Sequence, residues 1–477
     1  MRPTMLWLLA TICVVHAVQA ASMPSDSSVS SPEQRSLGRT QSGYTVSTQG
    51  FDITSKGGAS AKIYTFSYVR PAPHPESRPV IFAWNGGPGG PSTWLHFGFL
   101  GPKRFEFPQP GQKPGRIQVV DNKLSLLDVA DVVFIDPVGT GYTEASKEAA
   151  VSFYDTEADG LATADVVKAW LRANGRLASP IYLIGESYGG TRVAVATHFL
   201  DEPDKFSINL VGLVMISQTI TNEVRDHMEM PNILSYVASL STFNRIAAYH
   251  GVLKGSAADL EALQREARKF ASGEYLSALY QGRDLPEKER VSIAERLEQF
   301  TGISSTYFLA HGLGISRDEF SRKLLEDKGL ILSEEDGRYT GPVDGPDPLM
   351  AHFTPSFDSV AQTEIDKLPR PGANVQYKDY SPDIAKIWRF GSSSGERPNV
   401  RYIEHSMTVR PGLRLMIVSG EYDLGTSIGV ADYVMRHSNI DRSRTTLLSY
   451  HAGHMVYMDP DSAADLSRKL HAFVLGK

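Results

Sequence analysis

Residues 181–200 read IYLIGESYGGTRVAVATHFL: an apolar run, a serine flanked by glycines, and then a stretch that can form a helix. Within it, residues 185–189 (GESYG) fit the pattern G-x-S-x-G. Glycines two positions either side of a serine let the backbone make the tight turn that presents a hydroxyl at the tip of a strand. The same pattern also arises as a plain strand-to-helix turn with a capping serine, so the surrounding sequence has to discriminate between the two.

The rest of the chain predicts an α/β fold. Continuous apolar runs without polar alternation are typical of strands covered on both faces, as in a parallel sheet. Besides 181–186, such runs lie at 79–84, 131–136, 210–217 and 413–420. Residues 155–173 repeat apolar side chains at helical spacing, so strands and helices alternate. An antiparallel hairpin is expected earlier, where two strand-like runs, 44–54 and 61–70, flank a Lys-Gly-Gly turn.

This alternation stops near Asn222 and resumes near Pro411. The interval between carries amphipathic stretches, for example 287–300 and 317–327. We therefore expect a catalytic domain made of residues 44–221 and 406–477, with a mixed, mostly parallel sheet. A largely helical insertion, 222–405, is expected to cap the upper edge of that sheet.

The N-terminus resembles a secretory signal peptide. Arg2 precedes an apolar run at 5–15, and small residues at 17–20 predict cleavage after Ala20. A membrane anchor is the alternative, but that run is well short of the roughly 20 residues a span requires. The only cysteine, Cys13, lies in this segment, so the mature chain is expected to lack disulfides and thiolate metal sites.

The Ser-rich segment 21–43 that follows is expected to be a flexible lead-in. We therefore expect an exported protein, periplasmic or extracellular, without stable membrane association. The chain has 477 residues, 41% hydrophobic and 21% charged, and its net charge of -6 gives no sign of a nucleic-acid partner. No phosphate loop, dinucleotide fingerprint or Cys/His cluster is present, so no cofactor or metal is predicted.

A serine hydroxyl becomes a useful nucleophile only beside an oriented base. Where the nucleophile sits on this kind of turn, the chain order is serine, acid, histidine. Asp423 follows the apolar run at 413–420 and is the expected acid, with Glu421 and Asp432 as weaker candidates. The candidate base follows the last strand-like run of the chain.

Two histidines follow that run, His451 and His454. We choose His454 because Gly453 gives the turn room and Met455 can pack beneath the ring. The pair forms His-x-x-His without carboxylate or thiolate company, which is a poor metal site. The predicted catalytic triad is therefore Ser187, Asp423 and His454.

Attack by the serine creates an oxyanion, which needs preorganised N–H donors. One donor is expected to be the backbone N–H of Tyr188, directly after the nucleophile. The other is expected from the loop after an earlier strand, where residues 84–90 read WNGGPGG and Gly87 can offer its N–H.

Taken together, these residues resemble the serine carboxypeptidase family of α/β-hydrolases. Five segments carry the resemblance in the family's order: NGGPG (85–89), VVFIDPVGTGYT (132–143), GESYGG (185–190), VSGEYD (418–423) and AGHMV (452–456). They span about residues 80–220 and 411–475, the catalytic core, whereas the insertion matches less clearly. The resemblance implies an α/β-hydrolase fold and substrates that are peptides with a free C-terminus.

The resemblance also implies that Asn85, Gly86 and Glu186 hold the substrate's terminal carboxylate. Two carboxyl groups can share a hydrogen bond only if one is protonated, so Glu186 would have to keep its proton. Peptide binding would then weaken as the pH rises, and activity would be favoured at acid pH. The alternative is that Glu186 only caps or pairs locally.

The chain departs from the family's pattern at three places. Ala83 stands where a Trp is frequent, residues 90–92 (GPS) replace the frequent Cys-Ser-Ser with its disulfide, and Tyr457 replaces a usual proline. Other functions on the same scaffold are an esterase, an acyltransferase or a catalytically silent binding protein. Proline iminopeptidases share the GGPG loop but carry His where this chain has Asn85.

Overall fold

The computed structural model describes most of the chain, namely residues 35–41, 43–112, 117–201, 207–221, 232–372, 375–391 and 399–477. The expected signal peptide and most of the expected lead-in lie outside these ranges. Of the helices within them, none combines the length and apolar character that a membrane span requires.

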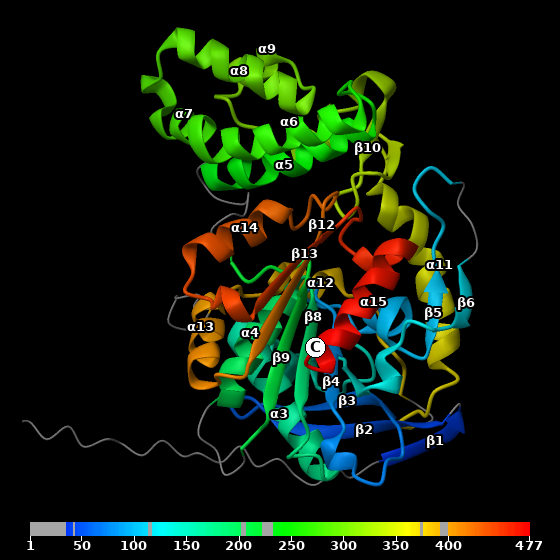
Figure 1. Ribbon diagram of the computed structural model, residues 1–477. Coiled ribbons are helices and arrows are strands. Elements are labelled where there is room, and N and C mark those ends of the chain that lie inside the picture. The colour runs from blue at the N-terminus through cyan, green and yellow to red at the C-terminus, as the bar shows by residue number, and fades with distance from the viewer. Residues whose placement is uncertain are drawn as a thin grey trace, which may run out of the picture.

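A nine-stranded sheet forms the centre of the molecule, in the order β1-β2-β3-β7-β4-β8-β9-β12-β13 (Figure 1). Six strands run parallel: β4 (Val80–Trp84), β7 (Asp131–Ile135), β8 (Ile181–Glu186), β9 (Leu210–Ile216), β12 (Arg414–Gly420) and β13 (Thr445–Tyr450). The first five are the apolar runs of the sequence, so the prediction of a mostly parallel sheet is confirmed. Every residue of β4, β7 and β8 is buried, which explains why these runs show no polar alternation.

The N-terminal strands form an antiparallel extension of this sheet. Strands β2 (Tyr44–Thr54) and β3 (Ser60–Val69) make the expected hairpin, and β3 pairs antiparallel with β7. Residues 35–41, which the sequence assigned to the flexible lead-in, form strand β1 (Arg35–Gln41) and pair with β2. This segment is therefore a strand rather than part of a flexible lead-in, because it satisfies its backbone hydrogen bonds by pairing with β2.

Helices cover both faces of the sheet and enclose two apolar cores. On one face, α3 (Thr156–Ala173), α4 (Tyr188–Asp201) and α14 (Ile428–His437) pack on alternate strand residues. On the other face, α15 (Pro460–Val474) packs on the intervening residues. This is the layered α/β architecture that the alternation of strands and helices predicts.

The interval 222–405 is not packed as one unit. Its first part forms a helical cap above the sheet in Figure 1, with an apolar core of its own. The cap helices are α5 (Ile233–Tyr249), α6 (Ala257–Phe270), α7 (Leu276–Gln281), α8 (Glu287–Thr301), α9 (Ser305–Ala310) and α10 (Arg317–Lys323).

The second part of the interval runs back along the catalytic domain. Helix α11 (Pro348–Ile365) buries Phe353 and Phe357 in one core, and α13 (Asn399–Val409) buries Ile403 in the other. The remaining short α-helices and strands are α1 (Thr93–Leu95), β5 (Lys103–Glu106), β6 (Gln118–Asp121), α2 (Lys147–Val151), β10 (Leu330–Leu332), β11 (Thr340–Pro342) and α12 (Pro382–Ile387), and a 3-10 turn, η8 (Val456–Met458), follows His454.

Candidate active site

The turn between β8 and α4 holds Ser187 in a left-handed backbone conformation, with φ of 59°. Such a conformation is uncommon for a residue with a side chain and stores strain where a function needs it. The Ser187 N–H donates to the Ile216 carbonyl of β9 at 2.8 Å. A Cβ added to Gly185 would lie 2.1 Å from the Gly189 carbonyl oxygen, so the turn closes only with glycine at 185. The turn that the GESYG motif predicts is therefore present.

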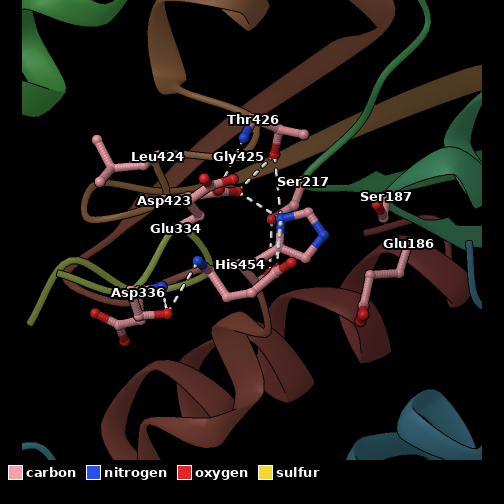
Figure 2. Close-up of polar contacts among 12 residues, drawn as sticks. Glu186, Ser187, Ser217, Glu334, Asp336, Asp423, Leu424, Gly425, Thr426 and His454 are labelled. Carbon is pink, nitrogen blue, oxygen red and sulfur yellow. Dashed lines mark hydrogen bonds and ion pairs between the residues drawn. The ribbon is translucent and has the colours of Figure 1, made fainter. Parts of the chain in front are cut away.

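The loops after β12 and β13 bring Asp423 and His454 together. Nδ1 of His454 lies 2.8 Å from Oδ2 of Asp423, and both side chains are buried. The carboxylate of Asp423 also accepts hydrogen bonds from the Thr426 N–H at 2.8 Å and the Thr426 hydroxyl at 2.5 Å. In Figure 2 the imidazole of His454 extends from Asp423 toward Ser187, so the predicted serine, acid and base converge. No serine–imidazole hydrogen bond is drawn among these residues, and such bonds are often long without substrate.

The competing candidates lie elsewhere in the structure. Glu421 pairs with Arg245 of the cap at 2.9 Å and with His451 at 3.1 Å. The His451 side chain is 68% exposed, and Asp432 lies half-buried on α14. Of the candidate residues, Asp423 and His454 form the contacting pair whose imidazole extends toward Ser187.

A segment of the insertion, residues 333–339, which we call the bridging segment, crosses the loops that carry Asp423 and His454. The Glu334 carbonyl accepts from the N–H groups of Leu424 and Gly425 at 3.0 and 2.9 Å, and the Glu335 carbonyl accepts from the His454 N–H at 2.7 Å. A Cβ on Gly453 would lie 2.4 Å from Cβ of Asp336. Gly453 thus gives room, as expected, but the room is filled by the bridging segment. The sequence did not predict that this segment lies there.

The bridging segment also supplies a second carboxylate. Oε2 of Glu335 lies 3.7 Å from Nδ1 of His454, and the Glu335 side chain is 34% exposed. Burial alone lowers the pKa of His454, but the negative charges of Asp423 and Glu335 outweigh it, and the net effect raises this pKa. Both carboxylates therefore stabilise the imidazolium that forms when His454 accepts a proton.

The glycine loop after β4 packs directly on the nucleophile. A Cβ on Gly86 would lie 2.5 Å from the Tyr188 nitrogen and 2.9 Å from Cβ of Ser187. Gly87 has φ of 106°, a conformation that favours glycine. The indole N–H of Trp84 donates to the Gly189 carbonyl at 2.9 Å and ties this loop to α4. The loop with Gly87 thus lies beside the Ser187–Tyr188 peptide, as an oxyanion hole requires.

Beside the serine lies a buried amide–carboxyl pair. Nδ2 of Asn85 donates to Oε1 of Glu186 at 3.1 Å, and Oδ1 of Asn85 accepts from the Leu95 N–H at 2.8 Å. Asn85 is 5% and Glu186 3% exposed. Burial raises the pKa of Glu186 to about 7, although the nearby charge of His454 opposes that rise. Of the described ion pairs, none includes Glu186, and its hydrogen-bond partner is Asn85.

A buried arginine contacts the backbone of Asn85. Arg192 is 1% exposed, and its Nη1 donates to the Asn85 carbonyl at 2.6 Å while its Nε donates to Asp159 at 2.7 Å. Sequence reasoning did not single out Arg192 or Glu335. The one available signal for Arg192 was a charged residue in a mostly apolar helix, shortly after the serine motif.

The parallel sheet, the strained serine turn and the acid and base on later loops define an α/β-hydrolase. A sequence model of the serine carboxypeptidase family matches residues 33–286, so the chain belongs to the serine carboxypeptidase family. It is accordingly a serine hydrolase.

Comparison with solved structures finds α/β-hydrolases at low sequence identity. An acetylester hydrolase from Corynebacterium glutamicum is 11% identical, with 90% of this chain and 96% of that one covered and a TM-score of 0.42. A thermostable carboxyl esterase from Bacillus coagulans is 11% identical, with coverages of 90% and 98% and a TM-score of 0.40. A peroxisomal α/β-hydrolase from Saccharomyces cerevisiae is 11% identical, with coverages of 92% and 91% and a TM-score of 0.39. No curated protein sequence matches the chain.

Proposed function

We propose that the protein is a serine-type carboxypeptidase that releases C-terminal residues from peptides through an acyl-enzyme. The observation that carries this proposal is the buried Asn85–Glu186 pair beside Ser187. A hydrolase of simple esters has no need for a protonatable carboxyl group at that position. A carboxypeptidase needs one to recognise the free terminus next to the scissile bond.

In the proposed reaction, Ser187 Oγ attacks the carbonyl carbon of the last peptide bond while Nε2 of His454 takes its proton. Asp423 holds Nδ1 and stabilises the imidazolium, assisted by Glu335. The N–H groups of Gly87 and Tyr188 stabilise the oxyanion. The imidazolium then protonates the leaving amino acid, and water hydrolyses the ester on Ser187 by the same steps.

The pH preference follows from Glu186. With its pKa raised to about 7, this side chain is neutral in acid and can donate a proton to the substrate's carboxylate. Above that pH both groups are negative and repel each other, so binding weakens. This supports activity favoured at acid pH.

The competing proposal is an esterase or acyltransferase on the same scaffold. Two blocked dipeptides that differ only at the terminus, a free acid and an amide, discriminate between them. We expect the acid to be cleaved at least tenfold faster, since one charged hydrogen bond is worth about 1.5–3 kcal/mol. Equal cleavage of both would refute the carboxypeptidase proposal.

Labelling by a fluorophosphonate, lost in Ser187→Ala, tests the nucleophile itself. The Ser443→Ala variant, on a surface 3-10 turn, serves as the matched control and should label normally. Persistent labelling of Ser187→Ala would assign the chemistry to another residue and contradict the proposal.

We also propose export to the periplasm or the exterior, where peptides are the substrates. The basis is the N-terminal sequence alone: Arg2, an apolar run and small residues before position 21. Sequencing the N-terminus of the mature protein should give Ala21 as the first residue. An intact Met1 in the exported fraction would contradict the cleavage.

A further inference from the structure

A second segment of the insertion, residues 378–384, crosses the glycine loop that follows β4. The backbone of Lys378 pairs with that of Gly141 through two hydrogen bonds of 2.8 and 2.9 Å, and the Ser381 N–H donates to the Gly89 carbonyl at 2.9 Å. A Cβ on Gly89 would lie 2.8 Å from the Ser381 carbonyl oxygen, so only glycine allows so close a crossing. The segment is therefore anchored to the catalytic domain at two points that are three residues apart.

Tyr380 lies between these two anchors, and it is 53% exposed. Its ring lies against the glycine loop. A Cβ on Gly87 would lie 3.4 Å from Cε2 of Tyr380, and a Cβ on Gly90 would lie 3.7 Å from Cδ2. These are ordinary contact distances, so the ring occupies the side of the loop on which the glycines leave room. A half-exposed aromatic ring on an anchored backbone is a preformed apolar surface beside the nucleophile.

The expected course of a peptide across this loop places the leaving residue beside that ring. The Gly87 N–H is the proposed donor to the oxygen of the scissile carbonyl. Asn85, two residues earlier in the same loop, belongs to the pair proposed to hold the terminal carboxylate. In a peptide, one nitrogen and one Cα separate that carbonyl from that carboxylate. The side chain of the leaving residue therefore projects from the stretch above the loop, whereas the acyl side departs from the carbonyl in the other direction.

The composition of the loop indicates which side chains such a subsite accepts. Residues 86–90 read GGPGG and supply no polar side chain. Next to such a loop, an aromatic ring favours apolar side chains, and flat ones most, because offset stacking adds to the burial of apolar area. The family model matches residues 33–286 only, so the match assigns no role to residue 380.

We propose that Tyr380 is a specificity-determining residue for the leaving amino acid: its exposed ring forms one wall of the subsite and favours large apolar, above all aromatic, C-terminal residues. This inference rests on the proposed carboxypeptidase function and deepens it by naming the class of substrate. The insertion then contributes to both halves of the reaction centre. The bridging segment supports the acid and the base, and residues 378–384 shape the space for the residue that leaves.

Blocked dipeptides that share the acyl residue and end in phenylalanine or in alanine measure this preference. The wild-type kcat/KM should be at least tenfold higher for the phenylalanine substrate, because added apolar groups in an apolar subsite change kcat/KM about 10-fold to 200-fold. Tyr380→Ala should lower this ratio about fivefold to tenfold, since the stacking partner is lost. Tyr380→Phe keeps the ring and should retain the ratio.

The matched control is Tyr280→Ala. Tyr280 is 84% exposed on α7, in the cap (Figure 1). This variant also loses an exposed tyrosine ring, but away from the glycine loop, so its ratio should equal that of the wild type. Thermal unfolding establishes that each variant is folded. Should Tyr380→Ala not fold, Tyr380→Leu takes its place, because leucine keeps an apolar side chain against the loop and removes only the aromatic plane.

The outcomes separate this inference from the function on which it rests. A folded Tyr380→Ala or Tyr380→Leu enzyme with the wild-type ratio would overturn the inference. It would also be overturned if the preference changed only in a second series, in which the acyl residue varies and the leaving residue stays constant, because the ring would then border the acyl side. A wild-type enzyme that cleaves free acid and amide equally would instead overturn the proposed function.

Discussion

Replacing Glu186 with glutamine tests the central electrostatic claim. Glutamine keeps an N–H donor at every pH, whereas Glu186 donates only while it is protonated. With a pKa of about 7 for Glu186, the affinity of the wild type for free-acid peptides should fall about tenfold per pH unit above that value. Two pH units above it the affinity would be about 1% of its value at acid pH. The Glu186→Gln variant should show no such fall until another group titrates.

The same substitution has a consequence for stability that does not depend on substrate. Burial raises the pKa of Glu186 from 4.5 to about 7, and at about 1.4 kcal/mol per pKa unit this difference corresponds to about 3 kcal/mol. Because the folded pKa lies above the unfolded one, this contribution is complete below pH 4.5 and is lost as the pH rises through 7. Glutamine cannot ionise and loses nothing over that window.

Urea unfolding at a series of pH values measures this effect. The free energy of unfolding of Glu186→Gln relative to the wild type should increase by up to about 3 kcal/mol across the window. Glu289→Gln, at an exposed position of α8, is the control and should show a constant difference. A constant difference for Glu186→Gln, together with a persisting alkaline fall in its affinity for free-acid peptides, would refute the assignment of this titration to Glu186.

Three further substitutions probe the neighbouring groups. Asp423→Asn should lower kcat about 10⁴-fold in steady-state kinetics, because the imidazole loses the acceptor that orients it; a loss below tenfold would contradict the triad. Glu335→Gln removes a negative charge 3.7 Å from His454, which lowers the imidazole pKa. The acid limb of kcat/KM should therefore move down by about half a pH unit. An unmoved limb would show that the charge of Glu335 does not affect the pKa of His454. Gly453→Ala places a methyl group 2.4 Å from Cβ of Asp336 and should lower the free energy of unfolding, measured with a chemical denaturant, by about 2 kcal/mol or more. An unchanged free energy of unfolding would contradict the close approach of the bridging segment to Gly453.

The fold was predictable because its signals are local. Fully buried strands such as β4 and β8 must be apolar throughout, and the turn at Ser187 requires glycine beside it, so both appear in the sequence itself. The order of the triad along the chain then reduced the choice of acid and base to a few residues. The structure brings Asp423 and His454 into contact with each other.

The supporting residues were not predictable in the same way. Glu335 and the bridging segment approach His454 from a polar stretch of the insertion, where no periodicity marks which carboxylate faces the site. Arg192 acts through a backbone carbonyl, which carries no sequence signature. For α11 and α13, an amphipathic stripe indicates that a helix is buried but does not indicate which surface buries it.

The bridging segment makes the insertion a structural part of the reaction centre. Removing or exchanging the helical cap at residues 222 and 405 would delete the acceptors that hold the Leu424–Gly425 turn and the His454 N–H. A chimaera that receives a foreign cap should therefore keep native residues 333–339 and join the new helices upstream of them. A cap exchanged at that boundary would leave the base and its carboxylates in place.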